Sequence, residues 1–258
     1  MLNISQIQTA YPPHLQSFKP FLLREYLQYK ILALLFKSEY ASQFVFLGGT
    51  CLRIVHDNNR FSEDLDFDNF NVTTEDFEKV ATFIKKGLER EGLLIEMEQV
   101  YRGAYHCYIK FPNLLYQTGL SGHKEAKILI QLDTEPQNFD YKPEAYLLNK
   151  FDVFGNIRTT PLDLLLSQKI TAFVQRRQPK GRDIYDITFL CSKTSPNYDY
   201  LSLRLGINNP EELKILLLDR FSSMNLNKLA TDVSSFLFSR NDVERIYLFS
   251  QFVKQTKF

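Results

Sequence analysis

The sequence predicts an α+β protein in which an N-terminal sheet domain with flanking helices is followed by a C-terminal helical bundle. Short apolar runs bounded by glycine or polar residues, which are typical of strands, recur up to about residue 158. Beyond that point the apolar side chains recur almost entirely at helical spacing. We therefore predict a first domain at 1–158 and a second at 159–258, because Thr159, Thr160 and Pro161 form a typical helix start.

The elements of the first domain follow from local patterns. Apolar residues at helical spacing predict a scaffold helix before Tyr40, and Thr73 provides the N-cap of a later helix. Alternating or continuous apolar runs predict the strands. The expected elements are, in order, a helix before Tyr40, a strand at Gln43–Leu47, a short helix at Thr50–His56, a strand through Leu65 and Phe67, a helix from Thr73 to Arg90, strands at Leu93–Val100, Ala104–Phe111 and Lys124–Asp133, and one or two strands within Tyr146–Arg158 with a turn at Gly155–Asn156.

The second domain is predicted to be helical throughout. Its expected helices lie at Leu162–Gln175, Asp183–Cys191, Tyr198–Leu205, Pro210–Leu218, Met224–Phe238 and Asn241–Lys254.

Composition excludes several classes of protein. The 31 basic and 30 acidic side chains nearly cancel, so any binding of nucleic acid must come from a local patch. Cys51, Cys107 and Cys191 are odd in number and lack CxxC spacing, which argues against a disulfide framework and against a zinc site. No apolar run approaches roughly 18 residues and the N-terminus lacks a signal pattern, so we expect a cytoplasmic protein that does not contact a membrane.

The residues that carry chemistry begin at the first strand. Gly48 and Gly49 end this strand, and a glycine pair followed by a helix lets backbone N–H groups approach a phosphate. Asp64 and Asp66 are two residues apart on the next strand, so their side chains point to the same face. Two carboxylates so close together keep their charge most easily around a divalent cation. Together these parts indicate a nucleotidyl-transfer site.

The sequence motifs of this stretch resemble those of a known family. Leu47-Gly48-Gly49 followed by Asp64-Leu65-Asp66-Phe67 resembles the signature of the polymerase-beta-like nucleotidyltransferase superfamily. The fuller wording, Gly-Gly-Thr-x-Leu-Arg with Arg-Phe-Ser-Glu-Asp-Leu-Asp-Phe, is similar to the AbiEii/AbiGii-type toxins of abortive-infection and toxin–antitoxin systems. The gap between the two motifs is slightly long for the superfamily, but a loop insertion costs little. The resemblance implies a nucleotidyltransferase-like mixed β-sheet with Gly48, Gly49 and Thr50 at the nucleotide.

The resemblance also implies a third acidic residue on a neighbouring strand, for which Asp133 is the best match. In that role Asp133 would act as general base for the attacking hydroxyl. The alternative is a turn residue at a strand end before Pro136, because Asp favours turns.

Three residues of the second domain form another candidate group. Lys169 and Arg176 share a helix face, and Asp183 follows the helix-breaking segment after them. By spacing alone, a helix end with an Asp cap explains the pattern equally well. The resemblance implies that Lys169 binds the triphosphate, that Asp183 completes the active site, and that Arg176 assists.

Further residues are weaker candidates. Ser62 could touch the nucleotide phosphate or become modified by self-transfer. Arg53 could support the phosphate cradle or pair with an acid of the core. We interpret Asp68 as a strand-end residue and Asp186 as structural, and we expect His56, His106 and His123 to be surface or packing residues. Tyr185 is a candidate for stacking on a base.

The predicted function is metal-dependent transfer of NMP from an NTP to an acceptor hydroxyl. Two Mg²⁺ ions, with Mn²⁺ as an alternative, would be bound by Asp64, Asp66 and Asp133. The resemblance favours a tRNA 3′ end as acceptor and a cognate antitoxin encoded nearby. A protein side chain, a small molecule as in antibiotic-modifying enzymes, and a degenerate, non-catalytic interaction module are the alternatives.

Overall fold

The chain divides into two compact units, which are described separately. The computed structural model describes residues 1–258, apart from the side chain of Arg102. Unit 1 comprises Met1–Cys51 and Ser62–Thr159, and unit 2 comprises Leu52–Phe61 and Thr160–Phe258. The chain therefore enters unit 2 twice. The second crossing lies between Thr159 and Thr160, next to the boundary expected between residues 158 and 159. The segment Leu52–Phe61, which the sequence analysis places in the first domain, groups with the helices of unit 2.

Unit 1 is built on one seven-stranded mixed sheet in the order β3-β4-β5-β2-β1-β7-β6. The central strands β1 and β2 are antiparallel, and each has a parallel neighbour on its outer side, β7 and β5 respectively. Antiparallel hairpins complete both edges. The strands are β1 (Phe44–Leu47), β2 (Leu65–Asn69), β3 (Glu96–Arg102), β4 (Ala104–Phe111), β5 (Ile128–Glu135), β6 (Glu144–Lys150) and β7 (Val153–Thr159).

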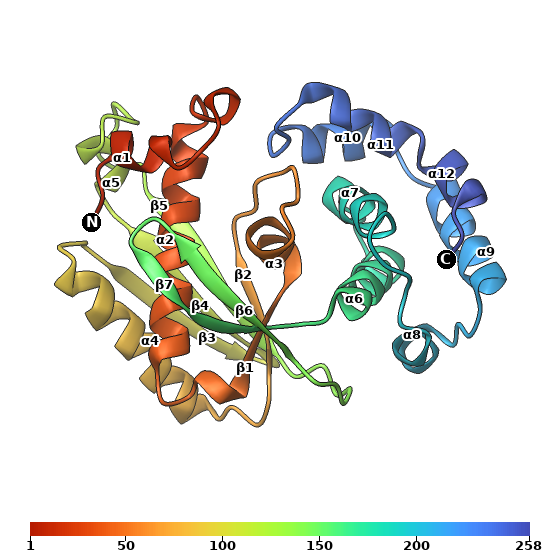
Figure 1. Cartoon of the computed structure of the whole chain (residues 1–258), viewed down its shortest axis with the longest axis horizontal. Helices are drawn as coiled ribbons and strands as arrows, with labels where there is room; N and C mark the ends of the chain where they lie inside the picture. The colour runs from red at the N-terminus through yellow and green to blue at the C-terminus, as the bar shows by residue number, and fades with distance from the viewer. The chain divides into compact units, whose positions relative to one another are not determined.

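Two long helices cover one face of this sheet. Helix α2 (Lys19–Lys37) packs on β7, β5 and β6, helix α4 (Thr74–Arg90) packs on β3 and β4, and the two helices contact each other (Figure 1). The predicted N-cap of α4 is confirmed: Thr73 and Asp76 form a reciprocal capping box. The shorter helices of this part of the chain are α1 (Ile4–Thr9), α3 (Gly48–Val55), which continues into unit 2, and α5 (Leu114–Gln117).

The turn between the last two strands differs from the prediction. It lies at Phe151 and Asp152, whereas Gly155 is paired within the β6–β7 ladder. Phe151 adopts a φ of 60°, and its ring packs edge-on against Tyr26 and Tyr29 of α2. Because this aromatic cluster holds the turn residue, the hairpin reverses here in spite of the glycine that follows.

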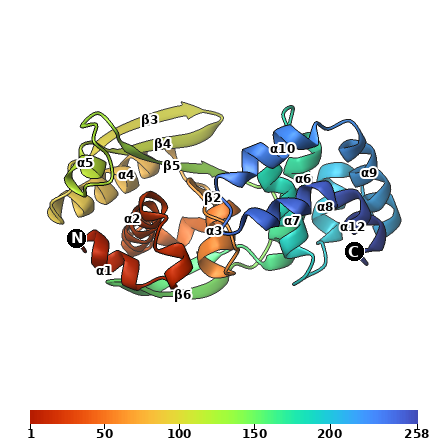
Figure 2. The same ribbon diagram turned by 90° about the horizontal axis from the view of Figure 1, so that it is seen from above.

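Unit 2 consists of helices and the segment Leu52–Phe61. Helices α6 and α7 lie side by side (Figure 2). The predicted helix at Asn241–Lys254 is divided into a 3₁₀ turn and two short helices, and that predicted at Met224–Phe238 is shorter. The helices are α6 (Leu162–Gln175), α7 (Gly181–Leu190), α8 (Tyr198–Leu205), α9 (Pro210–Ser222), α10 (Leu226–Ser234), α11 (Glu244–Tyr247) and α12 (Phe249–Gln255).

The segment Leu52–Phe61 is attached to the helices of unit 2 by backbone and aromatic contacts. Arg60 forms a β-bridge with Leu237, and the Phe61 N–H donates to the carbonyl of Phe236 at 2.8 Å. The rings of Phe61 and Phe238 lie 4.6 Å apart. These contacts explain why the segment belongs to unit 2 although its sequence neighbours on both sides lie in unit 1.

Within the described chain, no helix is both long enough and apolar enough to cross a bilayer.

Candidate active site

The acidic residues of unit 1 lie on neighbouring strands at one level of the sheet. Asp66 on β2 is the register partner of Asp133 on the parallel strand β5. Phe67 faces the helical layer, since its ring centroid lies 6.2 Å from that of Phe36 in α2. Because successive side chains of a strand alternate, Asp66 points to the opposite face of the sheet. Two carboxylates that the sequence expects to act together are therefore neighbours on that face.

The backbone at Gly48 is in close contact with Asp66. Gly48 has a φ of +80°, and a Cβ atom built on it would lie 2.0 Å from Oδ2 of Asp66. Only glycine fits this position, because any side chain would meet the carboxylate and would also disfavour the left-handed backbone. The first turn of α3 and the acidic strand thus meet without an intervening side chain.

The residues just before β2 are held through their backbone carbonyls. Thr50 is fully buried, and its hydroxyl donates to the carbonyl of Asp64. Nε2 of Gln28 in α2 donates to the carbonyls of Ser62 and Glu63 at 3.1 Å and 2.9 Å. Helices α2 and α3 therefore fix the path of the chain into the acidic strand.

Asp133 has a histidine partner that the sequence did not indicate. Nδ1 of His106, the register partner of Asp133 on the antiparallel strand β4, lies 2.7 Å from Oδ1 of Asp133. Nε2 of Gln131, two residues earlier on the same face, donates to both carboxylate oxygens at 2.8 Å and 3.0 Å. His106, which we expected to be a surface or packing residue, is thus in contact with a candidate site residue. No sequence motif indicates this pair, because it depends on the register of β4 with β5, which joins residues far apart in the sequence.

The candidate residues of unit 2 form an alternating chain of charges. Nζ of Lys169 lies 2.8 Å from Oδ2 of Asp186 and 4.0 Å from Oδ1 of Asp183. Nη1 of Arg176 is 2.5 Å from Oδ2 of Asp183. On the other side, Arg60 donates to both oxygens of Asp186 at 2.7 Å and 2.6 Å. The structure therefore brings together Lys169, Arg176 and Asp183, as the sequence predicts, and adds a buried ion pair behind them.

The buried pair of Arg60 and Asp186 is the anchor of this chain of charges. The side chains of Arg60 and Asp186 are 2% and 0% exposed, and Nδ2 of Asn58 also donates to Asp186 at 2.9 Å. Burial by itself would raise the pKa of Asp186, but the charges of Arg60 and Lys169 outweigh it and lower the pKa to about 2. Asp186 thus stays ionised and fixes the ammonium group of Lys169 through an ion pair, in line with the structural role predicted for it.

Tyr185 lies in different surroundings from those expected of a base-stacking residue. Tyr185 is fully buried, burial raises its pKa to about 12, and its hydroxyl donates to Asp242 at 3.3 Å. Its ring is therefore part of the core and is not available to stack on a base. The guanidinium of Arg53 lies 4.7 Å from the ring centroid of Phe238, and its Nη1 donates to the carbonyl of Asn58 at 3.3 Å, both within unit 2.

Carboxylate oxygens are the ligands that Mg²⁺ prefers. Mg²⁺ usually binds one or two protein carboxylates and completes its shell with water and substrate phosphates. Asp66 and Asp133, in register on one face, fit that donor set. In the part of the chain that the structure describes, no group of three or more His, Cys, Asp or Glu side chains is arranged to hold a metal ion. Joint ligation by Asp64, Asp66 and Asp133 therefore stays a prediction.

Comparisons with known proteins identify a family for this chain. A family model described as "Nucleotidyl transferase AbiEii toxin, Type IV TA system" matches residues 30–209. No curated protein matches the sequence significantly.

Three solved structures share the fold. A candidate nucleotidyltransferase from H. pylori is 16% identical, with a TM-score of 0.58 over 91% of this chain and 94% of that one. JHP933 from Helicobacter pylori is 17% identical, with a TM-score of 0.54 over 91% of each chain. MenT4, a nucleotidyltransferase toxin from Mycobacterium tuberculosis H37Rv, is 14% identical, with a TM-score of 0.55 over 100% of this chain and 91% of that one. The predicted fold class is confirmed by these similarities.

Proposed function

This chain belongs to the AbiEii family of nucleotidyltransferase toxins, and from this premise we propose that it transfers NMP from an NTP to an RNA hydroxyl, with the tRNA 3′ end as acceptor. The observation that best supports the proposal is the register of Asp66 with Asp133, on the face of the sheet that Gly48 approaches through its backbone. In the reaction, the acceptor oxygen bonds to the α-phosphorus, the bond from that phosphorus to the bridging oxygen breaks, and pyrophosphate leaves.

We assign metal binding to Asp64, Asp66 and Asp133, with Mg²⁺ as the ion and Mn²⁺ as a substitute. When bound, the metal would supply positive charge for the triphosphate and a lower pKa for the acceptor hydroxyl. The carboxylates of unit 1 provide the hard oxygen donors that such an ion requires.

The residues of the chain itself perform the remaining tasks. Asp133 accepts the proton of the attacking hydroxyl, and His106 and Gln131 hold its carboxylate in one orientation through their hydrogen bonds. Backbone N–H groups at Gly48 and Gly49 donate to phosphate oxygens at the start of α3. Ser62, next to the acidic strand, is assigned a lesser contact with the nucleotide.

In unit 2 we assign nucleotide phosphate binding to Lys169 and Arg176, and we place Asp183 among the catalytic residues. Three cations, Arg60, Lys169 and Arg176, face two carboxylates, Asp183 and Asp186, so the group carries one net positive charge. Lys169 is only 15% exposed and is held by both acids, which favours a fixed ammonium over a mobile one. Asp183 acts as the residue that orients Lys169 and Arg176.

A type IV toxin–antitoxin family implies an antitoxin, and we propose that one is encoded near this chain. We also propose that the protein acts in the cytoplasm, where NTPs and tRNA are present. A protein side chain or a small molecule as acceptor, and a non-catalytic interaction module, are the competing functions.

A transfer assay tests the proposal. The wild type and the Asp66→Asn variant are each incubated with Mg²⁺, total tRNA and one labelled NTP at a time. We expect label on tRNA from the wild type and at least a roughly 100-fold lower rate from the variant, with an unchanged melting temperature. Label on protein would show that the acceptor is a protein side chain and not tRNA. Absence of both transfer and NTP binding would favour the interaction module.

A further inference from the structure

A basic pocket lies within unit 2, and its lining does not include the charged residues around Lys169. It has a volume of about 460 Å³ and is formed by the loop after α6, the end of α9 and the first turns of α10. Its cationic lining residues are Arg177, Lys180, Arg220 and Lys228. Among the described lining residues Asp232 is the one acid, so four positive charges and one negative charge leave an excess of three.

Most of this positive charge is not neutralised by the protein. Arg177, Lys180 and Lys228 are exposed, and none of them forms an ion pair with a carboxylate of the described chain. The carboxylate of Asp232 accepts a hydrogen bond from the N–H of Gly181 at 2.9 Å, which directs it to the start of α7. Like charges brought this close repel one another unless an anion lies among them.

Arg220 gives the pocket a fixed wall. Its guanidinium donates to the carbonyls of Arg176 at 2.5 Å and Phe173 at 3.4 Å, at the end of α6. Gly181 brings the start of α7 against α10 so closely that a Cβ would lie 2.0 Å from the carbonyl oxygen of Leu229. These contacts hold α9 against the end of α6 and α10 against the start of α7 before any ligand arrives, which lowers the cost of binding.

The first turn of α10 adds to the positive potential. Asn225, which lines the pocket, is the N-cap of this helix and accepts from the N–H of Lys228 at 3.0 Å. The helix macrodipole places partial positive charge at this end. The helix end strengthens a site that the four cations already define.

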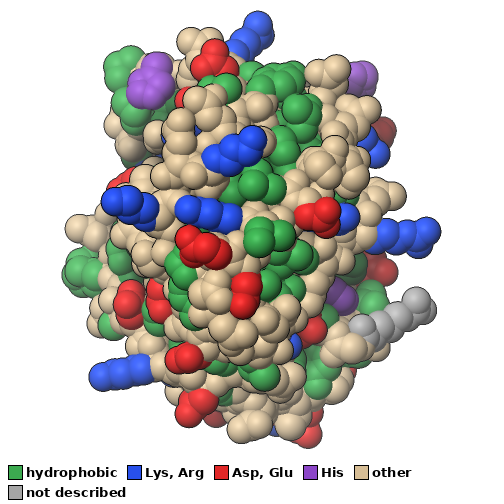
Figure 3. All heavy atoms as spheres, turned by 90° about the vertical axis from the view of Figure 1, so that its right-hand side faces the viewer, with side chains coloured by type: hydrophobic (Ala, Val, Ile, Leu, Met, Phe, Trp, Pro, Cys, Tyr) green, Lys and Arg blue, Asp and Glu red, His purple; other side chains and the backbone are tan. Residues whose placement is uncertain are grey.

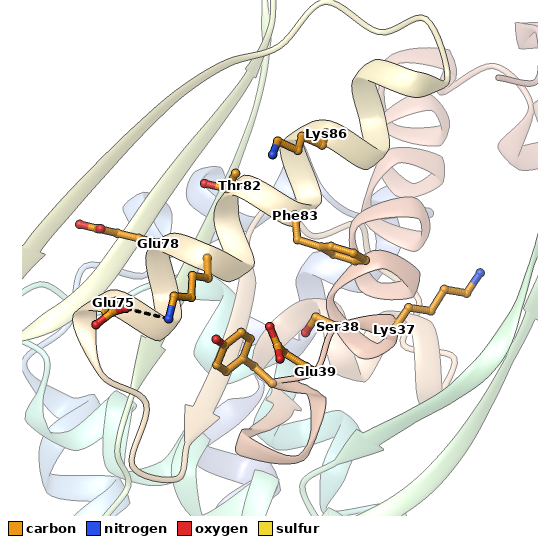
Figure 4. A pocket seen from close by; sticks show the side chains of 10 residues that line it. Lys37, Ser38, Glu39, Glu75, Glu78, Thr82, Phe83 and Lys86 are labelled. Carbon is orange, nitrogen blue, oxygen red and sulfur yellow. Dashed lines mark ion pairs between the residues drawn. The ribbon is translucent and has the colours of Figure 1, made fainter.

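The charge of this pocket is unusual for the chain. The cavity between α2 and α4 in unit 1, about 580 Å³, is lined by three lysines and three glutamates, and Lys79 pairs with Glu75 at 2.7 Å (Figure 4). On the face of the molecule seen from the side of α9 and α12, basic and acidic side chains are interspersed (Figure 3). With a net charge of +1 for the whole chain, an excess of three charges in one pocket is a local concentration.

We propose that this pocket binds phosphodiester groups of the acceptor RNA, an inference that rests on the proposed function. Arginine forks match phosphate oxygens, and lysines supply point charges around them. A concave pocket of this size encloses discrete phosphates, whereas a membrane surface would be matched by a flat basic face. The site would therefore hold the RNA by its backbone, independently of base sequence.

The test separates RNA binding from chemistry. Full-length protein carrying Asp66→Asn is titrated into fluorescently labelled tRNA at several salt concentrations, and anisotropy is measured. Lys180→Glu and Lys228→Glu are compared with Lys254→Glu, which makes the same charge change on the exposed surface of α12 outside the pocket. We expect each pocket variant to bind at least about tenfold more weakly, with a salt slope smaller by about one unit or more, and the control to bind within twofold of its parent.

Each result decides the proposal. Equal binding of the pocket variants and the Lys254→Glu control at matched melting temperatures would overturn it. Equal RNA binding combined with lost binding to vesicles containing anionic lipid would overturn it in favour of a membrane. Failure of the proposed function looks different: protein with Asp66 intact would then bind RNA through the pocket without transferring NMP to it.

Discussion

Gly48 and Asp66 are in such close contact that the carboxylate occupies the space in which a Cβ of residue 48 would stand. The contact joins the end of β1 to the acidic strand, where Leu47 is the register partner of Asp66. Because the glycine carries no side chain, its backbone reaches the acid directly. The first glycine of the motif is thus required by the acid that follows it, as well as by the left-handed backbone.

Substitution of Gly48 tests this contact. We expect Gly48→Ala to displace the Asp66 carboxylate and to lower the rate of nucleotidyl transfer by roughly 100-fold or more, because the acid would no longer lie at its site. The left-handed backbone adds a cost of roughly 1–2 kcal/mol to folding. Transfer rate and melting temperature measure the two effects.

Gly155→Ala is the matched control, since a Cβ at Gly155 in β7 would meet no atom within 4 Å. It should change neither quantity. Full activity in Gly48→Ala would contradict the role given to the contact.

The contact between His106 and Asp133 predicts that substitution of His106 lowers kcat without changing KM. His106→Leu removes one of the two partners of Oδ1, the other being Gln131, so we expect kcat to fall by roughly tenfold while KM for the NTP stays unchanged, because a misoriented base affects the reaction more than binding. His106→Asn, whose amide nitrogen can occupy the position of Nδ1, should recover most of the loss. A rise in KM alone would assign His106 to nucleotide binding instead.

The buried pair of Arg60 and Asp186 predicts a large loss of stability when it is broken. Asp186→Asn leaves a guanidinium buried without its counter-ion, which costs roughly 3–5 kcal/mol of unfolding free energy. The double variant Arg60→Met with Asp186→Leu should lose less than the sum of its single variants, because neither charge is left alone.

Denaturant titrations measure these changes in unfolding free energy. Glu75→Gln, which breaks an exposed pair with Lys79, is the control and should have no measurable effect. Additive losses in the Arg60 and Asp186 variants would show that the two side chains do not interact.

His56 predicts a loss of stability in mild acid. Burial and the charge of Lys193 lower its pKa from 6.5 to about 4, and its Nε2 is buried without a hydrogen-bond partner in the described structure. The unfolded chain then binds a proton more readily than the folded one. The free energy of unfolding therefore has its full value above pH 6.5 and decreases as the pH falls towards about 4. After an allowance for the partial exposure of His56, the decrease is about 2 kcal/mol.

Unfolding free energies measured between pH 7.5 and about 4 test this. His56→Phe should flatten the pH dependence in this window, whereas substitution of the exposed His123 by Gln should leave it as in the wild type. An unchanged slope in His56→Phe would assign the acid sensitivity to another group.

Local patterns in the sequence predicted much of the fold. The bounds of α6 and α8 agree with the helical spacing of their apolar residues, and the Thr73 cap begins α4 where expected. The alternation that places Asp66 opposite Phe67 is a property of any strand. These features depend on residues within a few positions of one another.

The tertiary structure decided what depends on distant residues. The turn at Phe151 is held by rings of α2, and α7 begins at Gly181, earlier than predicted, because Asp232 accepts its N–H. The basic pocket likewise collects cations from three separate elements.

By itself the sequence determined the glycine motif, the acidic pair, the helical spacing and the family to which the chain belongs. Only the tertiary structure decided that His106 holds Asp133 and that Arg60 is buried against Asp186, 126 positions away. The physical reason is that short-range propensity and periodicity are encoded in neighbouring residues, whereas strand register and ion pairing arise when distant segments pack together and buried charges must find partners.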